Sequence, residues 1–210
     1  MESLMSLREE EKLFWDAIDQ SNHNKDAHWS DYDIDQHLQD LVQYLSQLDK
    51  QQLLTFEKTL QLKLSQLYSA EIAELSTILE SDFTEKDGVF NFNAYLSDDG
   101  FIYFRCWLIL KGKEFFDDIQ EDIQNFVSGK YSFDIGDTWA ECLLYVADEA
   151  YSVHHENEEE SEIRDAVYLQ YPEHHYDFAA GEIERDLLNG VELQTRYPKL
   201  VKAICELRSE

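Results

Sequence analysis

The 210-residue chain contains 45 acidic residues but only 17 Lys and Arg, which gives a formal net charge of −28 at pH 7. A surface this negative repels phosphate, so the composition argues against a nucleic-acid-binding protein. It also attracts positively charged partners. Hydrophobic residues make up 43% of the chain and aromatic residues 13%, which is enough for a packed core and excludes disorder as the reason for the acidity.

The length suits one domain with a small addition. We expect a helical core domain over residues 1–160 and a helical C-terminal extension over 161–210 that packs on the same domain. No apolar run is long enough to span a bilayer, and the N-terminal segment lacks a signal-peptide pattern, so the sequence predicts a cytoplasmic protein. The three cysteines, Cys106, Cys142 and Cys205, lie in apolar helical stretches and are predicted to be buried, reduced thiols.

Four helices are predicted in the first 80 residues. The first covers about 6–20, where apolar residues recur with the helical period. The second is expected to begin after an N-cap at Ser30 and the third after Asp49. The fourth follows Ser69 and ends near Leu79. Ser and Asp are favoured at these starts because their side chains accept hydrogen bonds from amides of the first turn.

The most apolar helix is predicted over residues 97–111, with Ser97 as its N-cap and Gly112 at its end. Apolar side chains surround most of its circumference, which is typical of a buried helix. We therefore expect an all-α fold, a single compact multi-helix domain around this central helix. Arg105 lies within it, and we expect a structural ion pair there because a buried Arg needs an acidic partner.

The remaining elements are a short β-hairpin near 88–93, marked by the Asp87-Gly88 turn, and a second set of helices. These helices are expected over 113–127, 138–159 (capped by Asp137), 178–189 and 198–208.

A row of acids lies on the outer face of the helix predicted over 113–127, because the apolar residues of that helix face inward. The row consists of Glu114, Asp117, Asp118, Glu121 and Asp122. Several of these residues are spaced i, i+4, and the like-charge pairs together cost about 1 kcal/mol of helix stability. A merely solvated helix face explains the pattern equally well. The functional interpretation is a docking surface for a basic partner.

A second acidic block follows the His154-His155 pair. The block consists of Glu156, Glu158, Glu159 and Glu160. His and Glu four residues apart on a helix can hold a divalent metal, and the segment around His174-His175 offers a similar set. The sequence leaves open whether the two His pairs meet in space. A solvated helix end explains the block without a metal, so we predict no metal or other cofactor and treat the block as a second candidate surface for the partner.

Chemical motifs are otherwise missing from the sequence. The Asp31-x-Asp33-x-Asp35 string begins like a calcium loop but lacks the required Gly and the closing Glu. There is no nucleophile elbow, no Gly-rich phosphate loop and no cysteine with a local helper. We predict no catalytic residues and expect a protein that is not an enzyme.

One long string, S-D-D-G-F-x-Y-F-R-x-W-L-I-x-x-G-K at 97–113, resembles the hallmark of domain-of-unknown-function family 4240. The strings at 14–19, 56–57 and 141–151 are similar to the same pattern, so the resemblance covers about 10–155. It implies a helical bacterial domain and carries no assigned activity.

Two classes of function remain. The first is an acidic binding protein that neutralises a basic partner, and in a bacterial setting this suggests an immunity protein that blocks a toxin, for example a nuclease with a basic cleft. The second is a stand-alone regulatory or carboxylate-metal protein of unknown reaction. We favour the first because the charge excess favours a basic partner and no catalytic set is visible.

Overall fold

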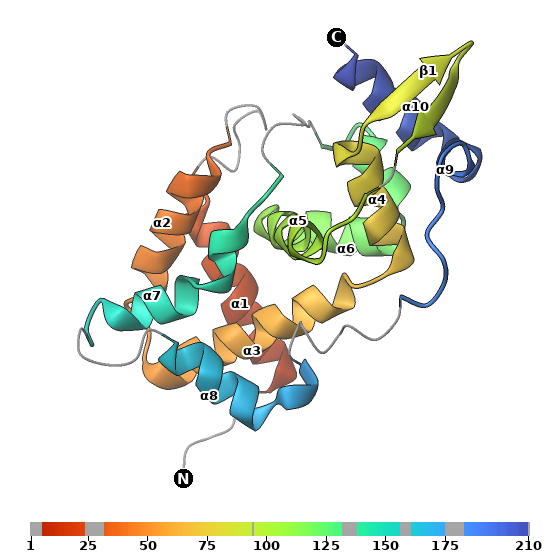
Figure 1. Cartoon of the computed structure of the whole chain (residues 1–210). Coiled ribbons are helices and arrows are strands. Elements are labelled where there is room, and N and C mark those ends of the chain that lie inside the picture. The colour runs from red at the N-terminus through yellow and green to blue at the C-terminus, as the bar shows by residue number, and fades with distance from the viewer. Residues whose placement is uncertain are drawn as a thin grey trace. The chain divides into compact units, whose positions relative to one another are not determined.

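In the described residues the fold is helical apart from one two-stranded antiparallel sheet, which confirms the predicted all-α class with a minor β-hairpin (Figure 1). The computed structural model describes residues 6–23, 32–93, 95–131, 138–155, 161–174 and 183–209. Within these residues, no helix is both long enough and apolar enough to cross a membrane.

Contacts divide the chain into two compact units. The first unit is built from the described residues of 1–27, 31–66 and 140–181, and the second from those of 67–139 and 182–210. The C-terminal segment after residue 160 is thus shared between both units. The predicted division into a core domain over 1–160 and an extension over 161–210 packed on the same domain stays a prediction.

The first unit is arranged around α3, which contacts α1, α7, α8 and η4. Its elements are α1 (Leu7–Ser21), α2 (Ile34–Leu45), α3 (Lys50–Gln66), η3 (Glu141–Leu144), α7 (Val146–Ser152), α8 (Glu162–Gln170) and η4 (Pro172–His174). Phe14 of α1 and Phe56 of α3 are fully buried, with ring centroids 5.0 Å apart. Burial of such aromatic pairs is a main source of stability in a unit this small.

Helix α1 begins near its predicted start, and α3 follows its predicted cap. Ser6 accepts a hydrogen bond from the first turn of α1, and Asp49 does the same for α3. The start of α2 differs, because the carboxylate of Asp33 accepts a hydrogen bond from the Gln36 amide at 2.9 Å and is the N-cap. Ser30, the predicted cap, lies outside the described residues.

The long helix predicted over 138–159 is replaced by two short pieces, η3 and α7. Tyr145 separates them, because its backbone (φ −116°, ψ −8°) departs from regular α-helical geometry. Asp137, the predicted cap, lies outside the described residues. The sequence analysis did not predict α8. The helix predicted over 178–189 is wrong in its described part, since residues 183–189 contain no helix.

The second unit contains the predicted central helix. Its elements are α4 (Ala70–Glu80), β1 (Phe83–Lys86), β2 (Val89–Phe92), α5 (Asp98–Leu110), α6 (Lys113–Glu121), η2 (Ile123–Val127), α9 (Glu192–Arg196) and α10 (Pro198–Arg208). Ser69 and Ser97 cap α4 and α5 as predicted. Pro198 is the first residue of α10, where its missing N–H costs nothing.

The β-hairpin begins earlier than predicted. Phe83 pairs with Phe92 and Lys86 with Val89 around a two-residue turn. Asp87 in that turn has φ 55°, and the following glycine has φ 77°, as a tight hairpin turn requires.

Helix α5 is buried on nearly all sides within its unit, as predicted for 97–111. Trp107 is 2% exposed and stacks on Phe104 at 5.6 Å between ring centroids. Arg105 is 1% exposed, and its guanidinium lies 5.1 Å from the ring centroid of Tyr68. The ion pair expected for Arg105 stays a prediction.

The helix predicted over 113–127 is interrupted. Asp122 has an extended backbone (φ −159°, ψ 120°), which ends α6 and starts η2. Its carboxylate accepts a hydrogen bond from the Gln124 amide at 2.9 Å. An Asp that caps a new turn competes with continuation of the helix.

Candidate functional site

The first predicted docking surface lies along α6 and the turn after it. We call it the α6 acidic face: Glu114, Asp117, Asp118, Glu121 and Asp122. Glu114 and Asp117 have 76% and 53% of their side chains exposed, and Glu121 and Asp122 are also exposed. Four of the five acids are therefore exposed, and Asp118 is partly buried.

Two lysines neutralise part of the α6 acidic face. Lys113 pairs with Asp117 at 2.5 Å. Lys130 pairs with both Glu114, at 2.9 Å, and Asp118, at 2.6 Å. The expected self-repulsion of the row is thus offset, and the predicted cost of about 1 kcal/mol needs correction. Lys113 lies on the same helix as these acids, whereas Lys130 comes from the loop after η2 and its contact is not visible from the helical spacing.

Asp118 has a structural role within this face. Its carboxylate also accepts a hydrogen bond from the Tyr131 hydroxyl at 2.6 Å. The bonds from Lys130 and Tyr131 hold the pKa of Asp118 below its usual range. Burial and the bond to Asp118 raise the pKa of Tyr131 to about 12. Asp118 therefore ties the following loop to α6, so Glu114, Asp117 and Glu121 are the residues to test for partner binding.

The second predicted surface, Glu156 and Glu158–Glu160, lies outside the described residues. His154 and His155 just before it are exposed. The His155 ring stacks on Tyr151 with centroids 4.0 Å apart, and its Nδ1 lies 2.9 Å from the Tyr151 carbonyl oxygen. His175 also falls outside the described part of the chain. Within that part, no group of three or more His, Cys, Asp or Glu side chains could hold a metal ion.

A buried charge cluster in the first unit was not predicted. It joins α3, α7 and α8, and we call it the Glu57 cluster: Glu57, Gln61, Asp148 and Arg164. Glu57 is 2% exposed and accepts a hydrogen bond from Gln61 Nε2 at 2.8 Å. Asp148 is 7% exposed, and Arg164 Nε lies 3.8 Å from its Oδ2.

Asp148 supplies the cap that α8 lacks locally. Ser161, at the N-cap position, makes no side-chain capping bond. Instead Asp148 Oδ1 accepts hydrogen bonds from the amides of Ile163 at 2.8 Å and Arg164 at 3.2 Å. A carboxylate at this position satisfies first-turn amides and complements the helix dipole. The start of α8 is therefore fixed by a residue of α7.

The Glu57 cluster has an unusual charge balance. The pKa of Glu57 is raised to about 7, mainly by burial. The Gln61 bond and the charge of Arg164 act to lower this pKa, and the charge of Asp148 acts to raise it. Burial also raises the pKa of Asp148, against the hydrogen bonds from α8 and the charge of Arg164. Two buried carboxyl groups thus share one nearby guanidinium.

A second buried glutamate in the other unit has a full set of donors. Glu74 of α4 is completely buried. Arg185 donates to both of its oxygens, Tyr197 donates its hydroxyl hydrogen at 2.6 Å, and the Leu188 amide donates at 2.8 Å. Burial by itself raises the pKa of Glu74, but these donors outweigh it and hold the pKa below its usual range.

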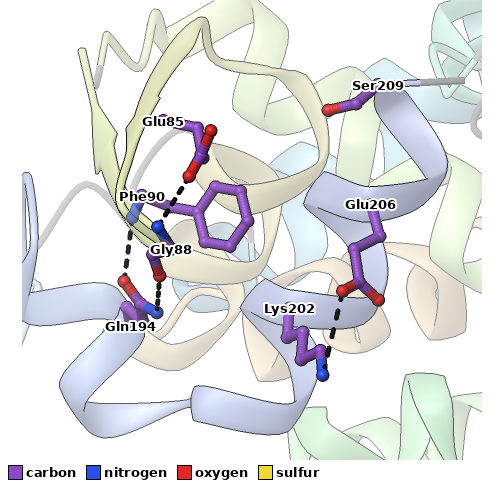
Figure 2. A pocket seen from close by; sticks show the side chains of 7 residues that line it. All are labelled: Glu85, Gly88, Phe90, Gln194, Lys202, Glu206 and Ser209. Atoms are coloured by element: carbon purple, nitrogen blue, oxygen red, sulfur yellow. Dashed lines mark hydrogen bonds and ion pairs between the residues drawn. The ribbon is translucent and has the colours of Figure 1, made fainter.

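A groove of about 750 Å³ opens in the second unit between the hairpin, α9 and α10 (Figure 2). Its lining residues are Glu85, Gly88, Phe90, Gln194, Lys202, Glu206 and Ser209. Gln194 bonds to the Phe90 amide and to the Gly88 carbonyl, each at 2.9 Å, and so covers the outer edge of β2. The charged lining is mixed, with Lys202 3.8 Å from Glu206, and does not select a ligand class.

The cysteines differ from one another. Cys106 and Cys205 are buried as predicted, but Cys142 on η3 is exposed, which corrects the expectation of three buried thiols. Burial, followed by the charges of Glu149 and Glu141, raises the pKa of Cys142. The short 3-10 turn at this point presents Cys142 on the outside, whereas a continuous helix was assumed.

One feature of the sequence indicates the Glu57 cluster, namely the position of Glu57 within its helix. Glu57 is four residues after Leu53 and three before Leu60, so it stands within the apolar stripe of α3. An acid at a core position of an amphipathic helix indicates a buried charge. Its charged partners, Asp148 and Arg164, lie more than 80 residues further along the chain, and no local pattern predicts them.

The described residues define a helical protein with an acidic exterior and buried carboxyl groups in each of its two units. The chain belongs to domain-of-unknown-function family 4240, described as a protein of unknown function, whose family model matches residues 10–153. The match confirms the resemblance inferred from the sequence strings. It includes Glu57 and Asp148 but ends before Arg164. No curated protein and no solved structure gives a significant match to the chain.

Proposed function

We propose that the protein binds a positively charged protein partner through its acidic surface. The observation that carries this proposal is the charge imbalance: 45 acidic against 17 basic residues leave 45 − 17 = 28 acids without an internal counter-charge even if every cation pairs once. The α6 acidic face is the described part of that surface. Its five acids meet two lysines, so it keeps a negative charge.

About half of the 17 basic residues are paired with acids within the protein, which supports the proposed role of the charge imbalance. Nine basic side chains form ion pairs with acids within the described residues: Lys12, Lys50, Lys58, Lys63, Lys113, Lys130, Arg164, Arg185 and Lys202. An external basic surface is the natural complement to what remains.

The more specific proposal is an immunity protein that neutralises a cognate toxin. A toxin that acts on nucleic acid needs a basic cleft to hold phosphate, and an acidic protein steered into that cleft associates fast and excludes the substrate. The assignment would be supported by a large toxin-like gene next to the gene of this protein. A gene neighbourhood without one contradicts it.

The experiment begins with affinity capture of partners and their identification by mass spectrometry, followed by surface-plasmon kinetics at low and moderate salt. The test variant replaces Glu114, Asp117 and Glu121 by Lys and leaves Asp118 and Asp122, which make structural hydrogen bonds, unchanged. Exposed charges act mainly on association, so we expect a slower association rate and a flatter salt dependence.

A matched control separates a local surface from overall charge. It replaces Asp35, Glu141 and Glu149, three exposed acids of the first unit, by Lys and so changes the net charge equally. If only the α6 variant loses association rate, that face is the docking surface. Equal losses indicate general steering by net charge. Wild-type rates and salt slopes in both variants contradict the proposal.

The alternative, a stand-alone regulatory or carboxylate-metal protein, is favoured by one observation, the buried carboxyl pair of Glu57 and Asp148. Isothermal calorimetry of the full chain with Mg²⁺, Mn²⁺, Ca²⁺ and Zn²⁺ tests its metal form. Stoichiometric binding that Glu57→Gln abolishes supports the alternative. Absence of binding heat with all four ions argues against it.

A further inference from the structure

The Glu57 cluster joins three helices of the first unit through groups that cannot all be charged at low cost. Glu57 lies on α3, Asp148 on α7 and Arg164 on α8. Asp148 and Arg164 already balance each other and fix the start of α8. When Glu57 is neutral, the cluster has no net charge. When Glu57 ionises, the cluster carries one unbalanced negative charge away from water, which is strongly unfavourable.

The polar atoms of the cluster show the same shortage of donors. Asp148 Oδ2 and Gln61 Oε1 are buried and accept no hydrogen bond within the described residues. Gln61 uses its Nε2 to donate to Glu57. A proton on Glu57 removes a negative charge and adds a donor to a cluster rich in acceptors, so the surroundings favour the neutral form of Glu57.

Charged groups on the neighbouring elements do not change this balance. On α1, Glu10 is held by Lys58 of α3 at 2.6 Å, and Glu11 is held by Lys63. On η4, the nearest acid is Glu173, which is exposed.

At the first residues of α3 and α8, Lys50 pairs with Glu162 at 2.6 Å. On α8 itself, Asp165 is exposed and adds negative charge near Asp148. Arg164 is therefore the cation that faces the two buried carboxyl groups.

We propose that Glu57 acts as a proton-operated latch that holds α8 against α3 and α7. With Glu57 protonated, Asp148 caps α8 and the three helices stay closed. Loss of the proton places a second charge in the closed cluster, and opening of α8 relieves it by admitting water. The latch is a property of the first unit and goes beyond the proposed binding of a basic partner.

The direction of the response follows from linkage. The pKa of Glu57 is about 7 in the closed state and 4.5, its ordinary value, when water reaches it. The closed state thus binds the proton more tightly. Its advantage is complete below pH 4.5 and is lost as the pH rises through 7. Opening of α8 therefore increases across the neutral range, on the order of 100-fold between pH 5 and pH 8.

Amide hydrogen exchange of the full chain tests the latch. The measured quantity is the opening constant of the α8 amides of residues 167–170, corrected for the intrinsic pH dependence of exchange. In the wild type we expect this constant to rise on the order of 100-fold from pH 5 to pH 8. In Glu57→Gln, which keeps the size and an acceptor for Gln61, we expect less than about a threefold change.

Two further variants complete the test. Glu149→Gln alters an exposed acid of α7 and should respond to pH like the wild type. Asp148→Asn removes the charge that raises the pKa of Glu57, so its transition should move to lower pH. Carbon-13 titration of the Glu57 carboxyl, assigned by its loss in Glu57→Gln, gives the ionisation directly. A wild-type opening constant that is flat with pH, or a Glu57 that titrates near 4.5, overturns the proposal.

Discussion

The two units each bury a glutamate in the middle of a helix, yet the two residues behave in opposite ways. Glu74 receives hydrogen bonds from Arg185, Tyr197 and the Leu188 amide, and its pKa falls below the usual range despite burial. Glu57 receives one hydrogen bond, from Gln61, and burial raises its pKa to about 7. The difference shows that the supply of donors, set against the cost of burial, decides whether a buried carboxyl group is charged.

The two sites also differ in what they do for the fold. The ionised Glu74 joins α4 to the segment around Arg185 and stabilises its unit at neutral pH. Glu57 stabilises its own unit only while it holds a proton. Glu74 therefore stabilises its unit when ionised, and Glu57 stabilises its unit only when protonated.

Removal of the guanidinium at the charged site should have the largest effect. Arg185→Ala leaves Glu74 buried without its main counter-charge, and we expect a loss of about 3 kcal/mol in the free energy of unfolding at pH 7, measured with urea. Glu71→Gln is the control, because Glu71 is 43% exposed and meets Arg185 from outside. It should cost less than about 1 kcal/mol. Equal losses in both variants would show that Glu74 does not depend on Arg185.

Neutralisation of Glu57 should raise the free energy of unfolding, whereas the change at Arg185 lowers it. Wild-type Glu57 loses its contribution to stability as the pH rises through about 7, so Glu57→Gln should be more stable than the wild type at pH 8, by about 2–3 kcal/mol. Near pH 4.5 the two proteins should be equally stable. Urea unfolding across this pH range, followed by circular dichroism, measures both differences. A variant less stable than the wild type at pH 8 would contradict the comparison.

A smaller change at Glu74 removes one neutral donor. Tyr197→Phe deletes a hydroxyl that lies 2.6 Å from the carboxylate in a buried setting, and we expect a cost of about 1.5 kcal/mol. Tyr145→Phe is the matched control, since its hydroxyl meets the exposed Glu141 at 3.4 Å. That change should cost less than about 0.5 kcal/mol, and thermal unfolding of both variants separates them.

The smallest predicted effect concerns the rates at which two cysteines react in the folded protein. Cys142 is exposed and should react with a thiol reagent, whereas burial protects Cys205 and raises its pKa to about 11. The acids near Cys142 disfavour its thiolate, so Glu149→Gln should speed its reaction a fewfold at pH 7. Mass spectrometry of the labelled chain identifies the thiol. Rapid labelling of Cys205 would show that its helix opens readily.

Much of the fold follows from local patterns. The caps at Asp49, Ser69 and Ser97 were predicted because Ser and Asp side chains at a helix start bond to the amide three residues further on. The hairpin turn at Asp87-Gly88 is equally local. These features need no information from elsewhere in the chain.

The elements that were missed depend on distant residues. Helix α8 was missed although Ser161 and Glu162 are residue types typical of a helix start. Ser161 makes no capping bond, and Asp148 of α7 supplies the acceptor instead. The break at Tyr145 divides a stretch that reads as one helix. The counter-charge of Asp118 comes from Lys130, twelve residues along and on a different element.

The sequence by itself determined the helical class, most helix starts, the buried α5 and the family, because these depend on periodicity, capping and contiguous strings. It also determined the charge excess on which the proposed binding of a basic partner rests. Tertiary structure decided which acids are neutralised and which buried carboxyl groups find donors. The state of an ionisable group depends on the charges and dipoles that folding gathers around it, and residues such as Glu57, Asp148 and Arg164 meet only in space.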